Sequence, residues 1–239
     1  MPPRLLRLLW GLWFCMLALF VALVRYPVST GLRRAACLVL LSLLWAGLLG
    51  LCWRLRIVRY GILALTGLIA GFLVWPAGGP LNAAELRAAY IEALRRYDGV
   101  PYVWGGENRR GIDCSGLIRR GLIDALVSSG LRTGNPGLVR SALALWWNDT
   151  TAKALGEGRD DLTVPLFEVP SINETESSHL QPGDLAVTRS GIHILAYLGE
   201  GQWIEADPQE LQVLTCSVPS KVNWFQIPMR VVRWKILAP

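Results

Sequence analysis

The chain has 239 residues and a formal net charge of +6 at pH 7, which leaves room for one catalytic domain and a further element. No Asp or Glu precedes Glu85, whereas eight arginines lie between Arg4 and Arg59. These arginines alternate with apolar runs instead of clustering on a folded face, so the composition argues against nucleic-acid binding and favours a membrane protein.

Three apolar runs follow one another at the start of the chain. They cover Leu8–Val24, Ala35–Trp53 and Ile57–Trp75 and hold 17, 19 and 19 residues. Such lengths suit α-helices that cross a hydrocarbon core of about 30 Å. We therefore expect residues 1–79 to form a three-helix transmembrane anchor with a linker, and residues 80–239 to form a catalytic domain.

The arginines also predict the orientation of the anchor. With the N-terminus in the cytoplasm, five of the eight arginines fall on the cytoplasmic side and three on the outer side, as the positive-inside rule favours. Everything after Trp75 is then expected on the outer side. The alternatives are a cleaved signal peptide for the first run and a buried soluble hairpin for all three.

Two helices are predicted around a glycine-rich turn. Asn82 and Glu85 have the spacing of a capping box and predict the start of a helix of about four turns. After the turn, apolar residues at helical spacing predict a second helix that begins at Cys114 and ends at Gly130.

The remainder of the chain is predicted to be mainly β-structure. Leu138–Trp147 is expected to form a short helix, and the polar, turn-rich stretch Glu157–Glu176 a surface loop. The predicted strands are Leu185–Thr188, Ile192–Leu198, Gln202–Ala206, Leu211–Thr215 and Met229–Leu237. The expected fold class of the catalytic domain is therefore α+β, with helices packed on an antiparallel sheet.

Cys114 is the candidate nucleophile because it opens a helix. The free N–H groups and the positive dipole end at a helix start stabilise a thiolate, so we expect the pKa of Cys114 to be lowered. The thiolate is the nucleophilic form of cysteine. The alternatives are a buried packing residue and a disulfide with Cys216.

His193 is the candidate base, since the chain has two histidines and the other, His179, lies in the polar loop. A tight hairpin would place positions 193 and 205 nearly opposite each other, so Glu205 is expected to orient the imidazole. Asp207 is a rival for that role. With Cys114, these residues form a nucleophile, a base and an orienting group.

Four short blocks follow one another in the catalytic region. They read Tyr102-Val-Trp-Gly-Gly106, Gly111-Ile-Asp-Cys-Ser-Gly116, Leu180-Gln-Pro-Gly-Asp-Leu185 and His193-Ile-Leu-Ala-Tyr-Leu-Gly199. In order and approximate spacing they resemble the signature blocks of the NlpC family of papain-like cell-wall cysteine peptidases. The resemblance covers about residues 81–234 and leaves the apolar runs outside.

The resemblance implies a papain-like domain that hydrolyses amide bonds in bacterial peptidoglycan stem peptides, typically between D-glutamate and a diamino acid. The site residues it implies are Cys114, His193 and Glu205 for catalysis and Tyr102, Asp113 and Ser115 for substrate binding. It implies no cofactor, and no Cys/His cluster has the spacing of a metal site. With the anchor, the chain is expected in the bacterial inner membrane, its catalytic domain on the periplasmic or outer side.

Two features depart from the family pattern. Glu205 stands where the family usually has His, Asn or Gln, and the stretch between Cys114 and His193 is longer than usual because of residues 131–179. One alternative is therefore an inactive or repurposed domain that binds stem peptides or acts as a scaffold. Another is a Cys-His acyltransferase or deamidase. The sequence predicts no oligomeric state.

Overall fold

The N-terminal third of the protein consists of three long apolar helices. The computed structural model describes residues 2–76, 78–79 and 82–238. The helices are α1 (Pro3–Arg25), α2 (Gly31–Leu51) and α3 (Arg56–Val74). Each is long and apolar enough to cross a membrane, so the helices fit the predicted membrane anchor. Part of the predicted linker after Trp75 lies outside the described residues.

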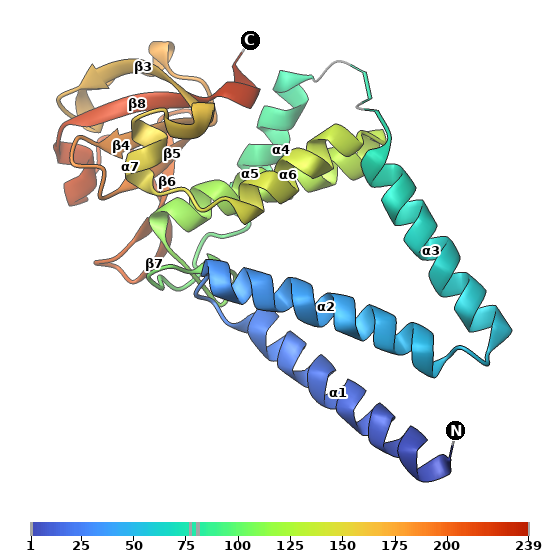
Figure 1. Ribbon diagram of the computed structural model, residues 1–239. Helices are drawn as coiled ribbons and strands as arrows, with labels where there is room; N and C mark the ends of the chain where they lie inside the picture. The colour runs from blue at the N-terminus through green and yellow to red at the C-terminus, as the bar shows by residue number, and fades with distance from the viewer. Residues whose placement is uncertain (1, 77, 80–81, 239) are drawn as a thin grey trace.

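The helices of the anchor are arranged as a hairpin and a separate arm. α1 and α2 pack antiparallel, and the indole N–H of Trp13 donates a hydrogen bond of 2.9 Å to the carbonyl oxygen of Leu44. α3 diverges from α2, so the three helices form a V whose open end faces the catalytic region (Figure 1). Arg140 ties the end of α3 to the following region by hydrogen bonds of 2.8 Å to the carbonyl oxygens of Leu73 and Trp75.

The region after α3, which is the predicted catalytic region, combines four α-helices with a six-stranded antiparallel sheet of order β3-β8-β4-β5-β6-β7. The helices are α4 (Ala83–Arg95), α5 (Cys114–Thr133), α6 (Pro136–Trp147) and α7 (Ala152–Gly156). The strands of the sheet are β3 (Thr163–Val169), β4 (Asp184–Thr188), β5 (Ile194–Gly199), β6 (Gln202–Asp207), β7 (Gln212–Ser217) and β8 (Met229–Trp234). A short hairpin of β1 (Glu107–Asn108) and β2 (Gly111–Ile112) precedes α5. The α+β fold with an antiparallel sheet is confirmed.

Helix α5 is held between the sheet and two other helices. Its residues Leu117, Ile118, Leu122 and Leu126 are fully buried in one core with α4 and the sheet. A second core covers the opposite face of the sheet and includes Phe225. Because α5 is buried along most of its length, its first residue has a fixed position relative to β5 and β6.

The predicted end of this helix at Gly130 is wrong. The helix continues to Thr133, and Gly134 caps it with a left-handed backbone at φ 63°. Gly130 instead allows α6 to approach, since a Cβ there would lie 2.9 Å from the carbonyl oxygen of Asn135. The sequence places two glycines near the end of the pattern, and packing decides which one ends the helix.

The predicted surface loop at Glu157–Glu176 is also wrong in part, because it contains strand β3. This strand lies at the edge of the sheet and pairs only with β8. Its side chains are mostly half-buried or exposed, and Pro165 interrupts it at a register shift. Edge strands tolerate proline and polar residues. The sequence of β3 therefore has the composition that is typical of a loop, although the segment forms a strand.

The division into an anchor at 1–79 and a catalytic domain at 80–239 stays a prediction. The two parts contact each other beside the first residue of α5, where the connection between α1 and α2 reaches the glycine-rich turn (Figure 1).

Candidate active site

Asp113 fixes the start of α5 and the glycine-rich turn together. One carboxylate oxygen accepts a hydrogen bond of 2.6 Å from the N–H of Gly116, and the other accepts one of 2.8 Å from the N–H of Gly105. The hydroxyl of Ser115 donates to the same carboxylate at 3.0 Å. Gly116 has to be glycine, because a Cβ there would lie 2.2 Å from the carbonyl oxygen of Gly106. The turn is thereby held against the helix that begins with Cys114.

Cys114 is a buried thiol at the first position of α5. Burial, and next the Asp113 carboxylate, raise the pKa of the Cys114 thiol to about 12. The backbone N–H groups of Ser115 and Ile194 act in the opposite direction and are outweighed. The predicted lowering of this pKa is therefore wrong, because the helix start supplies less stabilisation than burial removes. The resting residue is a protonated thiol.

We expect alkylation of Cys114 by iodoacetamide to speed up by about tenfold per pH unit between pH 7 and pH 10, because the thiolate fraction grows tenfold per unit below the pKa. The rate is read by mass spectrometry of the peptide that carries Cys114. In the urea-unfolded chain the rate should level off above about pH 9, near the ordinary thiol pKa. A rate in the folded chain that is already constant below pH 8 would contradict the protonated resting thiol.

His193 and Glu205 form a buried pair on the sheet side of the cleft. His193 Nε2 lies 2.5 Å from Glu205 Oε2, and both side chains are almost fully buried. This contact leaves Nδ1 as the ring nitrogen available to a proton from the cleft. The second Glu205 oxygen has no partner among the described residues, and burial raises the pKa of Glu205 despite the neighbouring imidazole.

The two residues are diagonal neighbours instead of direct opposites: Glu205 lies on β6, and His193 directly precedes β5, which begins at Ile194 and not at Ile192 as predicted. The register pairs Ala196 with Ile204, which places Glu205 opposite Leu195. His193 lies two residues beyond Leu195 and so shares its face of the sheet. Asp207, the rival orienting residue, accepts a hydrogen bond of 2.6 Å from the N–H of Gln209 and caps the next turn.

Two further contacts of His193 come from residues that the sequence analysis missed. The indole of Trp224 stacks on the imidazole, with ring centroids 4.2 Å apart and an interplanar angle of 18°. Thr188 accepts hydrogen bonds from the N–H groups of Ile192 and His193 at 3.0 and 3.1 Å. Trp224 lies in a short turn with no helix or strand periodicity, so no local pattern marks it.

One cleft of about 690 Å³ brings the predicted residues together. The predicted site residues that line it are Tyr102, Asp113, Cys114, Ser115 and His193. Glu205 contacts the base from behind and does not line the cleft. Cys114 Sγ lies 4.0 Å from the carbonyl oxygen of Ile192, the residue before the candidate base. Ser29, from the connection between α1 and α2, lines the same cleft and was not predicted.

Tyr102 lies close to Cys114. Burial, and next the charges of Cys114 and Asp113, raise the pKa of the Tyr102 phenol above its ordinary value. The phenol therefore stays protonated at neutral pH and can donate a hydrogen bond inside the cleft. His179, the other histidine, is exposed beside Phe167, outside the cleft.

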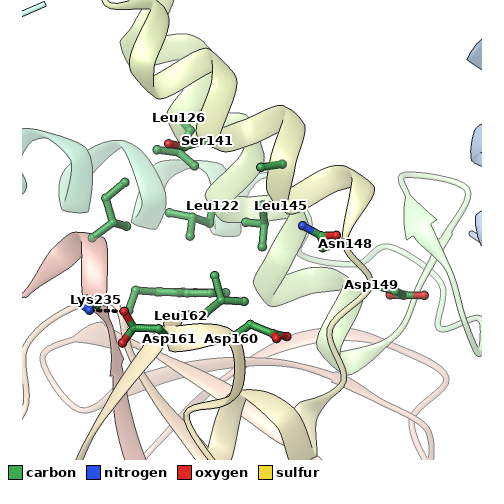
Figure 2. A pocket seen from close by; sticks show the side chains of 13 residues that line it. Leu122, Leu126, Ser141, Leu145, Asn148, Asp149, Asp160, Asp161, Leu162 and Lys235 are labelled. Atoms are coloured by element: carbon green, nitrogen blue, oxygen red, sulfur yellow. Dashed lines mark hydrogen bonds and ion pairs between the residues drawn. The ribbon is translucent and has the colours of Figure 1, made fainter. Parts of the chain in front are cut away.

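A second hollow of about 650 Å³ lies between α6 and the end of β8. Figure 2 shows Leu122, Leu145 and Leu162 facing this hollow, with the ion pair of Lys235 and Asp161 at its rim. Its lining contains neither cysteine nor histidine. It therefore lacks a nucleophile and a base, and the cleft at Cys114 is the candidate active site.

A family model described as "NlpC/P60 family" matches residues 99–233. The chain belongs to the NlpC/P60 family. The match includes helix α5, His193, Glu205 and the cleft residues other than Ser29, and it begins after the three apolar helices. The resemblance stated from the four sequence blocks is thereby confirmed.

Several solved structures of NlpC/P60 proteins are similar to the chain. The peptidoglycan hydrolase RipB of Mycobacterium tuberculosis is 22% identical over 72% of this chain and 79% of its own, with a TM-score of 0.40. An NlpC/P60 protein of Bacillus cereus is 18% identical over 67% of this chain, which spans only 41% of that protein, with a TM-score of 0.39. The NlpC/p60 domain of the peptidoglycan hydrolase SagA is 25% identical over 61% of this chain and 97% of its own, with a TM-score of 0.32. No curated protein is similar enough to match.

Proposed function

We propose that this NlpC/P60 protein is a membrane-anchored cysteine peptidase that hydrolyses amide bonds in peptidoglycan stem peptides. Within this class we propose the bond between D-glutamate and a diamino acid. The observation that carries the proposal is that Cys114, at the start of a buried helix, and His193, held by Glu205, face one cleft. The catalytic region is proposed to lie on the outer side of the bacterial inner membrane.

Acylation begins with a proton transfer, because the resting thiol is protonated. The Sγ–H proton moves to Nδ1 of His193 as Sγ attacks the amide carbonyl carbon. The backbone N–H of Cys114 and neighbouring donors are proposed to meet the oxyanion. The imidazolium then gives its proton to the leaving amine, and the acyl group stays on sulfur as a thioester. Glu205 holds the ring through Nε2 in both steps.

Deacylation reverses these roles. A water molecule gives one proton to His193 and attacks the thioester carbonyl, and that proton returns to sulfur as the product leaves as a carboxylic acid, which then ionises in water. Stacking of Trp224 on the imidazole fixes the plane of the ring, so the same nitrogen serves both half-reactions.

The substrate contacts are proposed for the residues around the nucleophile. The Tyr102 phenol lies beside Cys114 and suits a carbonyl or carboxylate oxygen of the stem. Asp113 brings a carboxylate to the cleft wall, which suits a free amine of the peptide, although both of its oxygens also hold backbone N–H groups. Ser115 lies beside it with its hydroxyl on the same carboxylate.

The proposed function is tested with the full chain in lipid nanodiscs. It is incubated with purified peptidoglycan and with free stem peptides, and the products are identified by mass spectrometry. New fragments that end in D-glutamate are expected, and none from a preparation alkylated beforehand at pH 9. Fragments cut at another amide would overturn the proposed bond, and intact substrate throughout would overturn the peptidase function.

A second candidate is a stem-peptide binding module, and one observation favours it. Burial holds Cys114 protonated in the resting site, which an inactive domain tolerates. The same experiment separates the two functions, because a binding module retains intact stem peptides and releases no fragments.

A further inference from the structure

The α1–α2 connection, residues 26–30, forms backbone hydrogen bonds to the glycine-rich turn. The N–H of Ser29 donates to the carbonyl oxygen of Gly105 at 2.7 Å, and the N–H of Glu107 donates to the carbonyl oxygen of Pro27 at 3.0 Å. These bonds form an antiparallel bridge, so the connection extends the β1–β2 hairpin. The anchor therefore contributes a backbone segment to the wall of the cleft.

A buried arginine of α2 reinforces this junction. The Arg34 side chain is 2% exposed and donates hydrogen bonds to Ser29 Oγ at 2.9 Å and to Glu107 Oε2 at 3.1 Å. Glu107 also pairs with Arg119 of α5, one turn after the nucleophile. One carboxylate thus joins the membrane helix α2 to the catalytic helix α5, and the anchor cannot swing freely relative to the cleft.

The position of the junction fixes the height of the cleft above the bilayer. Residues 26–30 join the end of α1 at Arg25 to the start of α2 at Gly31, and a connection this short between two membrane spans stays at the level of the lipid headgroups. Ser29 of this connection lines the same cleft as Cys114. The nucleophile therefore lies beside the membrane surface, whichever side of the membrane that surface faces.

The rim of the cleft has the composition of a membrane interface. Trp104, next to the hydrogen-bonded Gly105, is 80% exposed and lines the cleft, and exposed tryptophan is typical of the headgroup level. Arg25, Arg109 and Arg110 line a neighbouring hollow of about 390 Å³. None of the three has a carboxylate within 4.0 Å in the part of the chain that the structure describes. Asp124 lines the same hollow, and Arg109 lies over the ring of Tyr97 at 5.7 Å. Arginines at this level that have no carboxylate within ion-pair distance suit lipid phosphates.

We propose that the cleft acts on stem peptides held at the membrane surface by a lipid tether, rather than on the distant wall network. This inference rests on the proposed peptidase function and narrows its substrate class. A cleft at headgroup level reaches an amide that is joined to a lipid by a short link, because neither substrate nor enzyme has to extend away from the bilayer. A tether also raises the effective concentration of the peptide at the cleft.

The test compares three substrates with the full chain in vesicles of one lipid composition. One stem peptide is joined directly to a lipid, the second is joined to the same lipid through a flexible Gly/Ser linker of about 30 residues, and the third is free in solution. Vesicles with equal surface densities of both lipid-linked peptides are used, and the initial rate of cleavage is read by mass spectrometry. We expect the directly joined peptide to be cleaved at least as fast as the long-linked one, and at least about tenfold faster than the free peptide.

The linker comparison separates the height of the cleft from simple enrichment on the membrane. A cleft far above the bilayer would cleave the long-linked peptide and leave the directly joined one intact, and that result would overturn the inference. A free peptide cleaved as fast as the directly joined one would also overturn it and would leave the peptidase function standing. Failure to cleave all three would overturn the peptidase function itself, together with this inference.

Discussion

Cys114→Ala in the full chain is expected to lower amide hydrolysis by at least about 10⁴-fold, because removal of a nucleophile eliminates the covalent route entirely. The free energy of unfolding should change by less than about 1 kcal/mol. The thiol donates one weak hydrogen bond, 4.0 Å from the carbonyl oxygen of Ile192, and alanine leaves the capping of α5 by Asp113 intact. Turnover of a defined stem peptide and urea unfolding in detergent measure the two effects.

Cys216→Ala is the matched control. Cys216 is a partly buried free thiol on β7, and burial raises its pKa to about 11. Unlike Cys114, it does not line the cleft. Its substitution should leave turnover unchanged. Retained hydrolysis in Cys114→Ala would show that Cys114 is not the nucleophile, and equal losses in both variants would point to a loss of folding.

Much of the fold follows from local signals in the sequence. The Asn82 cap is formed as predicted, with its side chain accepting hydrogen bonds from the N–H groups of Ala84 and Glu85. Helix α5 begins at Cys114 as predicted, because Asp113 is a cap and the apolar spacing starts there. Helix caps and the spacing of apolar residues depend on a few neighbouring residues. They can therefore be predicted without knowledge of the tertiary structure.

The errors fall where distant residues decide the outcome. β3 has a polar pattern and a proline, and only its partner β8 makes it a strand. Gly130 is an interior glycine because α6 packs on it. The direction of the Cys114 pKa shift depends on how deeply the helix start is buried, and periodicity does not reveal that depth.

The candidate site shows the same division. Cys114 on α5, His193 just before β5 and Glu205 on β6 were predicted, since each lies in a recognisable block or hairpin. Trp224, Ser29 and Arg34 were not, because Trp224 lies in a turn and the other two come from the predicted membrane anchor. An arginine next to an apolar run is interpreted as a flanking charge that sets membrane orientation. The residues around Arg34 in the sequence do not indicate a buried ion pair with Glu107.

That ion pair predicts a large effect on stability. Glu107→Gln is expected to lower the free energy of unfolding by about 3–5 kcal/mol, because two buried guanidinium groups lose the carboxylate between them. The carboxylate left to Arg34 and Arg119 would be that of Asp149, at 3.6 and 2.9 Å, whose side chain is 63% exposed. Their other hydrogen bonds go to neutral oxygens, among them Ser29 Oγ and the carbonyl oxygen of Leu145. Burial lowers the pKa of Arg119, and the Glu107 carboxylate opposes that shift. Removal of the carboxylate charge therefore makes the charged form of the buried Arg119 less stable. Urea unfolding in detergent, followed by tryptophan fluorescence, measures the change.

Glu92→Gln is the matched control, because it removes the same charge from an exposed ion pair with Arg96 on α4. Exposed pairs contribute about 0–1 kcal/mol, so the difference between the two variants reports burial and not the substitution itself. Glu107→Gln should also speed hydrogen exchange at the backbone N–H of Ser29, which donates across the junction. If the two variants unfold at the same urea concentration and Ser29 stays protected, Glu107 does not hold the anchor against the catalytic region.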